Sequence, residues 1–317
     1  MKRTLDVKEL SIVLHEVLGE EGRSLAVPVD AHTMAVTQMR LGDHAFAHYA
    51  DDEARWELLS AFCALGLAGG EKVVVLADPA IPVDEVYQRL FPDDVFADKA
   101  LATGQLTFQN MHAMIHPDRH FTAERQISRL FEEIEQARRQ GYTGLRSAID
   151  MAWVHAWGLD VEGVMHRETH AHALFARRQY AELCSYDRRR FAPEVIEAMR
   201  IGHPTALLER PGDLAAHPSI NGLHLIGDAD MATREQFAAA LRKAFTDAAV
   251  VGRLLLDLSR LAFLSAACAA DLLRLVVQAD RYERVDVHCS PFHAQVLRKL
   301  GAAQVKRLTV TTTRERP

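Results

Sequence analysis

The first two thirds of the chain alternate between short apolar runs and longer segments in which apolar residues recur at helical spacing. The runs predict strands at residues 44–49, 72–77, 105–109, 144–149 and 181–185, and the periodic segments predict helices at 51–68, 82–90, 122–140, 161–177 and 193–199. In the helix at 122–140 the inward stripe consists of Ile127, Leu130, Phe131, Ile134 and Ala137. Strands that alternate with helices in this way predict an α/β fold with a largely parallel sheet covered on both faces.

The pattern stops at residues 205–222, which contain Pro211, Gly212, Pro218 and Gly222 without a clear period. We interpret this segment as a linker. Beyond it, strands expected at 223–226, 250–258, 285–289 and 305–310, with helices between them, predict a smaller α/β domain at 223–312. Residues 41–204 then form the first domain, and residues 1–40 hold one amphipathic helix at 7–18 and an irregular segment.

The apolar run at 250–258 is broken only by Arg253 and Asp257, which is the pattern of a strand buried on both faces. Ser265 stands where the following helix begins, so its hydroxyl is expected to cap that helix. The inward stripe of the helix is expected to contain Ala269, Leu272, Leu273, Val276 and Val277.

Polar and aromatic residues stand at the carboxyl ends of the strands of the first domain, where parallel sheets bind their ligands. They are His48, Tyr49, Asp78, Asn110, Asp150, Trp153, Tyr186 and Asp187. His44 shares a face of its strand with His48, and these histidines, with Tyr49 and Trp153, are expected to line a pocket for a small, weakly polar ligand. Arg146 lies in a buried strand, and Asp150 is the partner that we expect for its charge.

Composition narrows the classes of function. A net charge of −6 without a basic block argues against nucleic acid as a partner. No apolar stretch is long enough to span a membrane and no signal peptide is visible, so a cytoplasmic protein without a membrane partner is expected. The four cysteines form no C-x-x-C pair and are expected to be buried, reduced thiols.

The sequence lacks several motifs that are typical of enzymes and metal sites. The strand ending at residue 77 is followed by DPAIP, without the glycines and lysine of a phosphate-binding loop, so ATP turnover is not expected. No G-x-S-x-G and no H-E-x-x-H occurs. Two sets of histidines recur every four residues, and we interpret them as solvated: His112, His116 and His120, and His166 and His170. We therefore expect no catalytic residue, no metal site and no cofactor.

Three segments of the first domain resemble the MEDS domain, a sensory module of methanogens and methylotrophs related to the recombinase-like α/β fold. They are DHAFAHYADDEARWELLSAFCALGLAGGEKVVVLAD (43–78), GYTGLRSAIDMAWV (141–154) and LCSYDRRRFAPEVIEAMRIGHP (183–204). The resemblance implies that the domain senses a small hydrocarbon derivative. Glu168 matches an acidic position of the family pattern, and a ligand-binding role is implied for it.

The second domain resembles the STAS domain of anti-sigma-factor antagonists through GDAD…T…F…AL (227–241) and LLLDLSRLAFLSAACAADLLRL (254–275). In that family the loop reads F-I-D-S-x-G, and a partner kinase phosphorylates its serine. Here Ser265 stands in the place of the Asp, Ala266 in that of the serine and Cys268 in that of the Gly. The usual phosphate switch is therefore expected to be missing, and phosphorylation of Ser265 one position earlier is the alternative.

Together the resemblances imply a non-enzymatic signalling regulator whose second domain binds an anti-sigma factor or a serine-kinase-type regulator. Its docking face is expected to contain Asp228, Asp230, Ser259, Ser265, Ala266 and Cys268, and the acidic pair would steer a basic partner. Two alternatives stay open. The chain could be a self-associating scaffold subunit, a homo-oligomer without a sigma-factor role, or its first domain could be a metal- or ligand-dependent enzyme.

Overall fold

The computed structural model describes residues 33–111, 122–157, 164, 167–168, 170–219, 222–246, 252–279 and 282–313. They form two compact units, one ending at Glu209 and one beginning at Arg210, and the segment Thr33–Gln38 groups with the second. That segment contains the short strand β1 (Thr33–Met34) and the turn η3 (Val36–Gln38). The helix expected at 7–18 lies outside the described residues, and so does part of the one expected at 161–177.

The first unit is built on a parallel sheet, as predicted. Six strands of this sheet follow one another in the order β7 (Thr205–Leu207), β2 (His44–Tyr49), β6 (Tyr180–Asp187), β5 (Leu145–Asp150), β3 (Lys72–Leu76) and β4 (Leu106–Gln109). All five neighbouring pairs in this series are parallel. The central strands β2, β3, β5 and β6 are buried almost throughout, which fits a sheet covered on both faces.

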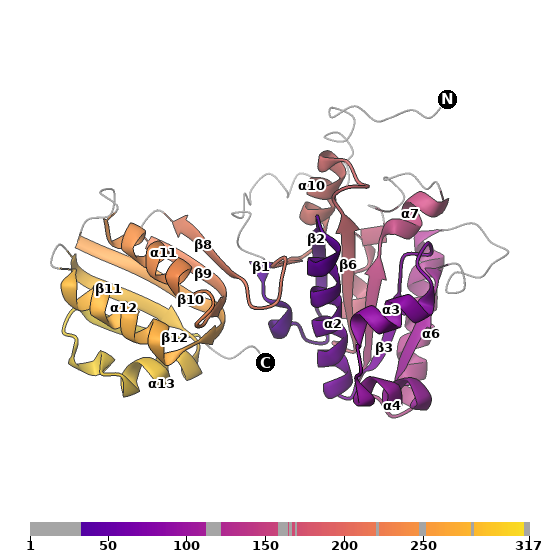
Figure 1. Ribbon diagram of the computed structural model, residues 1–317, viewed down its shortest axis with the longest axis horizontal. Coiled ribbons are helices and arrows are strands. Elements are labelled where there is room, and N and C mark those ends of the chain that lie inside the picture. Colours follow the sequence, from indigo (N-terminus) through magenta and orange to yellow (C-terminus); the bar gives the residue numbers. More distant parts are fainter. Residues whose placement is uncertain are drawn as a thin grey trace. The chain divides into compact units, whose positions relative to one another are not determined.

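Helices cover both faces of this sheet. They are α2 (Asp52–Ala68), α3 (Val83–Leu90), α4 (Val95–Thr103), α6 (Ala123–Arg139), α7 (Ala152–Trp157), α9 (His172–Phe175) and α10 (Pro193–Gly202). Figure 1 shows α2 and α3 on one face and α6 and α10 on the other. Helices α4 and α7 were not predicted. The inward position of Phe131 on α6 was predicted wrongly, because its side chain is 38% exposed.

The pleat of the strands distributes polar residues between the two faces. On β5, Arg146 and Asp150 point toward α2, where they contact Phe62 and Arg55. On β6, Glu182 and Cys184 point to the opposite face, the one covered by α6 and α10. We call these the α2 face and the α6 face of the sheet.

The second unit has a five-stranded sheet in the order β12-β11-β10-β9-β8. Its strands are β8 (Leu214–Ser219), β9 (Gly222–Ala229), β10 (Gly252–Leu264), β11 (Tyr282–Cys289) and β12 (Leu308–Thr312), and β8 alone among them pairs antiparallel. Helices α11 (Arg234–Thr246), α12 (Ala266–Gln278) and α13 (Pro291–Lys299) pack on it, and a short turn, η4 (Ala302–Gln304), precedes β12. At Gly222 the strands β9 and β10 are so close that a Cβ atom would lie 1.7 Å from the backbone oxygen of Leu255.

Three details of the second unit differ from the sequence-based expectation. Strand β10 is buried on one face only, since Leu254, Leu256 and Leu258 are inside while Leu255 is 38% exposed. Val277 is also exposed and does not belong to the inward stripe of α12. The segment 205–222, expected to be irregular, contains β7, which pairs with β2, and β8, which pairs with β9.

Within the described residues, no helix has the length and apolar character needed to cross a membrane.

Candidate functional site

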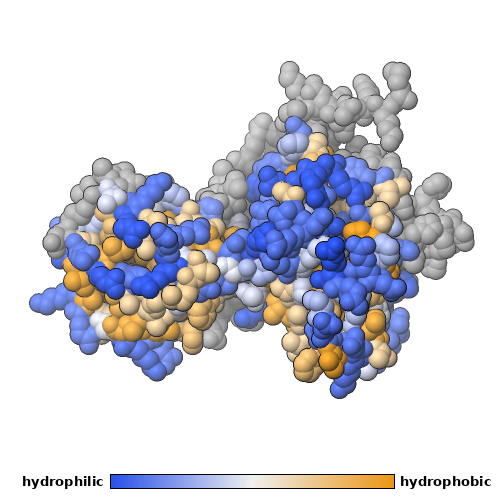
Figure 2. All heavy atoms as spheres, viewed as in Figure 1, coloured by the Kyte–Doolittle hydropathy of each residue, from blue (hydrophilic) through white to orange (hydrophobic). Residues whose placement is uncertain are grey.

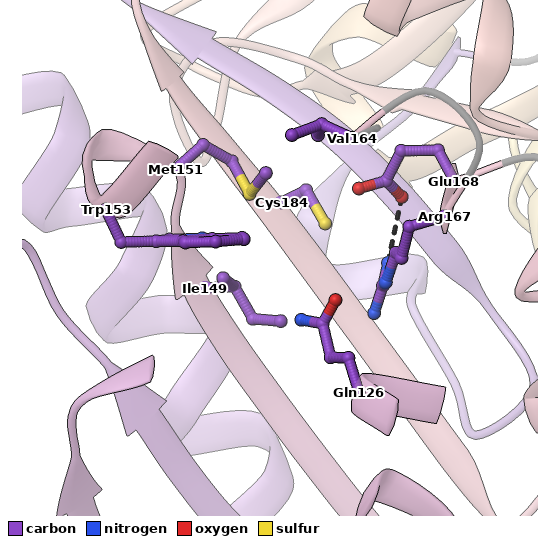
Figure 3. Close-up of a pocket in the computed structure, with 8 residues that line it drawn as sticks. All are labelled: Gln126, Ile149, Met151, Trp153, Val164, Arg167, Glu168 and Cys184. Carbon is purple, nitrogen blue, oxygen red and sulfur yellow. Dashed lines mark hydrogen bonds and ion pairs between the residues drawn. The ribbon is translucent and has the colours of Figure 1, made fainter. Parts of the chain in front are cut away.

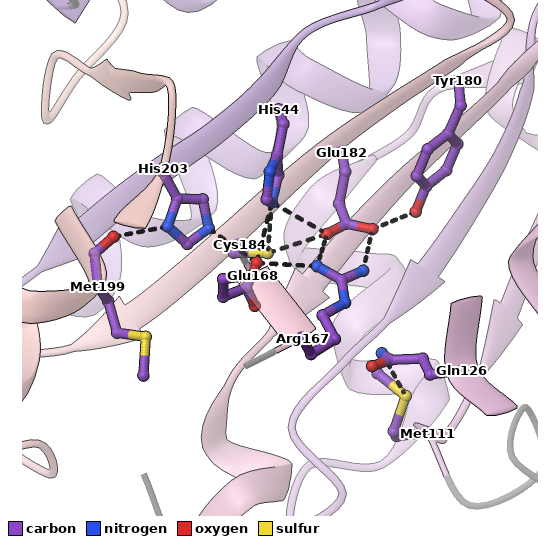
Figure 4. A network of polar contacts seen from close by, with 10 residues as sticks. All are labelled: His44, Met111, Gln126, Arg167, Glu168, Tyr180, Glu182, Cys184, Met199 and His203. Atoms are coloured by element: carbon purple, nitrogen blue, oxygen red, sulfur yellow. Dashed lines mark hydrogen bonds and ion pairs between the residues drawn. The ribbon is translucent and has the colours of Figure 1, made fainter. Parts of the chain in front are cut away.

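A fully buried cluster of ionisable side chains lies on the α6 face of the first sheet (Figure 4). His44 begins β2, while Glu182 and Cys184 stand two residues apart on β6 and therefore share a face. The other members come from outside the sheet and are Arg167 and Glu168, which precede α9, and His203, which ends α10. Four separate segments of the chain thus bring six titratable groups together away from water.

Arg167 neutralises much of the negative charge in this cluster. Its guanidinium forks onto Glu182, with Nη1 2.5 Å from Oε1 and Nη2 2.7 Å from Oε2, and Nη1 also donates to Glu168 over 2.9 Å. The hydroxyl of Tyr180 and the thiol of Cys184 donate to Glu182 as well. Burial opposes ionisation of both carboxyl groups, but Arg167 and the neighbouring imidazoles together outweigh it. The pKa of Glu168 therefore falls to about 2, and the pKa of Glu182 falls well below its usual range.

His44 lies between the two carboxylates. Its Nε2 atom is 3.0 Å from Oε2 of Glu168, 3.3 Å from Oε1 of Glu182 and 3.8 Å from Sγ of Cys184. Burial opposes a charge on the ring, but the two carboxylates outweigh it and raise the pKa of His44. Burial and the neighbouring carboxylates raise the pKa of the Cys184 thiol far above its usual value.

His203 is held in one tautomer by the backbone. Its Nδ1 atom lies 2.6 Å from the carbonyl oxygen of Met199, one helical turn earlier, and must donate its proton there. Burial, together with the charge of His44, lowers the pKa of His203 to about 4, so the ring is neutral at physiological pH. Its other nitrogen, Nε2, then carries a lone pair and faces Oε2 of Glu168 at 3.3 Å. Among the described residues Nε2 has no hydrogen-bond partner.

A narrow cavity adjoins the cluster (Figure 3). Its walls are apolar on one side and polar on the other, and they consist of Gln126, Ile149, Met151, Trp153, Val164, Arg167, Glu168 and Cys184. The gaps between these side chains are too narrow for even one water molecule. A molecule that binds here must therefore displace side chains.

Three of the predicted ligand-binding residues, His44, Trp153 and Glu168, belong to this cluster and its cavity. Tyr186 lies beside it, with its ring centroid 5.2 Å from that of Phe46 and its hydroxyl buried. His48 is half-buried on the same face. Tyr49 does not join them, because the pleat turns it to the α2 face.

The α2 face holds a second group of predicted residues, and one pairing there was predicted wrongly. Arg146 does not pair with Asp150, because it forks onto Glu71, with Nε 2.5 Å from Oε2 and Nη2 3.2 Å from Oε1. Asp150 instead accepts hydrogen bonds from Arg55 (2.5 Å) and from the hydroxyl of Tyr49 (3.1 Å).

At the carboxyl edge the remaining candidates take part in ion pairs or face solvent. Asp78 pairs with Arg190 at 2.6 Å. Asp187 pairs with Arg189, which reaches on to Asp52. Asn110 is exposed after β4. Local salt bridges thus connect the loops at this edge of the sheet, and the structure does not bring these residues into one pocket.

Sequence reasoning missed Arg167, Glu182, Cys184 and His203. Two signals were present. Glu182 is a charged residue inside a strand expected to be buried, where a charge requires a partner. Cys184 and His203 lie within the third segment quoted for the resemblance, LCSYDRRRFAPEVIEAMRIGHP.

In the second unit, the predicted docking residues gather mainly around the start of α12. Ser265 caps the helix by accepting a hydrogen bond from the backbone N–H of Cys268 over 3.2 Å, as predicted. Ala266 is exposed, whereas Cys268 is fully buried and donates its thiol to the carbonyl oxygen of Asp230. Asp228 is paired in register with Phe263 near the same end.

Ser259 is the exception, since it lies in the middle of β10, within the irregular stretch between Asp257 and Arg260. The structure adds two exposed apolar side chains that were not predicted, Met231 (68% exposed) and Phe263 (46%).

Comparison with protein families agrees with both resemblances. Residues 43–204, half of the chain, match the family described as MEDS, the MEthanogen/methylotroph, DcmR Sensory domain. Residues 214–310 match the family described as Mlab, STAS domain. No curated protein matches the chain. The order of the two domains expected from the sequence is thereby confirmed.

Proposed function

Because the chain belongs to the MEDS family of sensory domains and carries a STAS domain behind it, we propose that it is a non-enzymatic signalling regulator. Both families are regulatory or sensory, and a STAS domain has a regulatory role of the anti-sigma-factor-antagonist or a related type. In the proposal the first domain senses a small molecule such as a hydrocarbon derivative. The second binds an anti-sigma factor or a serine-kinase-type regulator.

The observation that carries the sensing role is the cavity of the α6 face. Ile149, Met151, Trp153 and Val164 give it apolar walls, and Glu168 with Arg167 gives it a polar end. This combination suits a small molecule with one polar group. Because the cavity has no room for even a water molecule, an occupant would move the surrounding side chains. Binding would then favour one arrangement of the domain over another, which is what a sensor requires.

Tryptophan fluorescence tests the sensing role, since Trp153 lines the cavity. Titration of the full chain with small alcohols, halogenated alkanes and amines should give a saturable change for at least one class. The change should persist in Trp56→Phe, whose tryptophan lies on the α2 face beside Arg55, and disappear in Ile149→Phe, which fills the cavity. A panel without any saturable response, or an equal response in Ile149→Phe, would contradict the proposal.

The geometry around α12 supports control by a ligand in place of phosphorylation. Ser265 already uses its hydroxyl as a helix cap, and Ala266 has no hydroxyl to modify. Exposed Met231 and Phe263 supply an apolar contact near Asp228 and Asp230. We expect the aspartates to orient a basic partner and the apolar pair to contribute most of the affinity.

Calorimetry with purified anti-sigma factors of the kinase type tests the docking face. Met231→Asp and Phe263→Asp should weaken binding at least about tenfold, while Phe292→Asp, an equally exposed position on α13 (62%), should not. Mass spectrometry after incubation with the kinase should find no phosphate on Ser265. Equal loss in all three variants would refute this docking face.

A second candidate function, self-association as a scaffold subunit, is favoured by a different surface. Val277, Phe292 and Leu300 on and after α12 and α13 are exposed, and Figure 2 shows apolar residues gathered on the visible side of the second unit. Such residues mark interaction sites when they are contiguous. Light scattering on the full chain tests this candidate function. An oligomer that dissociates in Phe292→Asp would support the scaffold role, and a monomer would contradict it.

A further inference from the structure

The cluster on the α6 face contains more metal-binding atoms than its hydrogen bonds use. His44, Glu168, Cys184 and His203 each direct one nitrogen, oxygen or sulfur atom to a common point, and these four atoms lie within 4.8 Å of one another. All four side chains are buried, and they come from four places in the chain. We propose that this is a binding site for a divalent transition-metal ion of the zinc type.

The lone pair of His203 is the first argument. Its Nδ1–H is committed to the carbonyl oxygen of Met199, so Nε2 can only accept. The atom opposite, Oε2 of Glu168 at 3.3 Å, is also an acceptor. Two acceptors that face each other inside a protein need a donor or a cation between them. A histidine that binds metal usually donates its other N–H to a backbone carbonyl, which is the arrangement of His203.

The spacing of the four atoms is the second argument. Zinc bonds of about 2.0 Å to nitrogen or oxygen and about 2.3 Å to sulfur place neighbouring ligand atoms of a tetrahedron roughly 3.3–3.8 Å apart. The structure has 3.0 Å from His44 Nε2 to Glu168 Oε2, 3.3 Å from that oxygen to His203 Nε2, and 3.8 Å from His44 Nε2 to Cys184 Sγ. These three separations need shifts of only a few tenths of an ångström, and the remaining pairs, none farther apart than 4.8 Å, need shifts of up to about 1 Å.

The surrounding charges fit a divalent ion with a thiolate ligand. Binding of the ion would displace the thiol proton of Cys184 and the Nε2 proton of His44 to solvent. The negative groups would then be Glu168, Glu182 and the thiolate of Cys184, and the positive ones Arg167 and the ion, so a dication leaves the site neutral. Glu182 is not counted as a ligand, because Arg167 and Tyr180 occupy its oxygens. It would instead hold the ligands in place from behind. Two imidazoles with a thiolate and a carboxylate select Zn²⁺ or Co²⁺ over Mg²⁺ or Ca²⁺.

This inference goes beyond the proposed function and does not depend on it, since metal content and the binding of organic molecules are measured separately. The test uses the full chain, stripped with a chelator and titrated with Co²⁺. We expect one ion per chain, visible ligand-field bands of a tetrahedral site, and a thiolate-to-cobalt band in the near ultraviolet. Added Zn²⁺ should displace the bound Co²⁺ and abolish these absorption bands. Wild-type protein that binds no stoichiometric metal, or binds it without the thiolate band, overturns the proposal.

Four variants locate the ion. Cys184→Ser should abolish the thiolate band, and both Cys184→Ser and His203→Ala should weaken Co²⁺ binding by about tenfold or more. Cys63→Ser, equally buried but on α2, and His293→Ala, buried in the second unit, should bind as the wild type does. Circular dichroism checks that each variant is folded. If a variant is not folded, the Co²⁺ titration of the wild type alone decides whether the metal site exists. Unchanged binding in both ligand variants would place the ion elsewhere and refute the site.

Discussion

Both faces of the first sheet bury arginine side chains, and the two faces compensate this positive charge differently. On the α2 face, Arg146 forks onto the single carboxylate of Glu71, and Arg55 likewise meets Asp150. Every buried cation there has one carboxylate. On the α6 face, Arg167 serves two carboxylates, and two imidazoles and a thiol share the same space.

This difference is the basis of our proposal that the network on the α6 face is functional, whereas the one on the α2 face is structural. The carboxylate of Glu71 receives two N–H groups of Arg146, which leaves it little capacity for another ligand. The α6 face can still accept a ligand, because Nε2 of His203 has no hydrogen-bond partner among the described residues. Four atoms that can coordinate a metal ion also lie close together there. The contrast can be tested through the stability of the first unit. Its unfolding can be followed by tryptophan fluorescence, since all three tryptophans lie at positions 56, 153 and 157.

The largest effect is expected from breaking the fork of the α2 face. Glu71→Ala leaves Arg146 buried without a partner and should lower the free energy of unfolding by about 3–5 kcal/mol, measured by urea titration. The double variant Glu71→Leu with Arg146→Met removes both charges and should recover most of the loss. A single variant that costs less than about 1 kcal/mol would show that this pair is not a structural element.

The pH dependence of stability tests the α6 face. Since the pKa of His203 is about 4 in the folded protein and near 6.5 when unfolded, the unfolded chain binds the extra proton between these values. The free energy of unfolding should therefore fall by about 3 kcal/mol as the pH drops from 6.5 to 4. His44 does not cancel this loss of stability. Because its pKa is raised in the folded protein, His44 stabilises the fold fully below pH 6.5, and this stabilisation is lost only as the pH rises.

Urea titrations at several pH values, with a chelator present, measure this slope. His203→Asn should flatten it between pH 4 and 6.5, whatever its effect on stability at neutral pH. A slope that is the same in wild type and variant would mean that His203 is not held neutral by its surroundings.

A matched pair of glycines compares the packing of the helices on the two faces. A Cβ atom on Gly66 of α2 would lie 2.6 Å from Cδ of Arg146 and 2.9 Å from Cγ2 of Val73, whereas one on Gly202 of α10 would meet nothing within 4 Å. Gly66→Ala should cost about 1–3 kcal/mol. Gly202→Ala should be neutral or stabilise by up to about 1 kcal/mol. Equal effects in the two variants would contradict the tighter fit assigned to α2.

The smallest effect is expected in the second unit. Ser265→Ala removes the cap of α12 and should cost about 1 kcal/mol, seen as faster hydrogen exchange of the amides in the first turn of that helix. Ser265→Asp keeps an acceptor at this position and should exchange as the wild type does. Exchange that is unaffected by the alanine would show that the hydroxyl does not cap the helix.

Much of the fold could be predicted from local patterns. The parallel strands β2, β3, β5 and β6 appeared as apolar runs, and the cap at Ser265 appeared in the change of period. The prediction failed where a neighbour far away in sequence decides the outcome. Strand β7 exists because it pairs with β2, and β8 because it pairs with β9, and neither has an apolar run of its own.

The candidate site was harder to predict for the same reason. His44, Trp153 and Glu168 were singled out, but their partners Glu182, Cys184 and His203 were not. The carboxyl ends of the strands were favoured, whereas the cluster lies on a face of the sheet, around the first residue of β2 and the middle of β6. Which carboxylate pairs with Arg146 also depends on the depth at which α2 crosses the sheet, and no spacing in the sequence states that depth.

The alternation along β6 has a consequence for how this protein can vary. Glu182 and Cys184 reach the α6 face only because each is an even number of residues from Tyr180. Inserting one residue before them would exchange the faces, so that Ala181 and Leu183 faced His44 while the carboxylate of Glu182 moved to the α2 face, away from Arg167. Insertions should therefore be tolerated in the turns that flank this strand but not inside it.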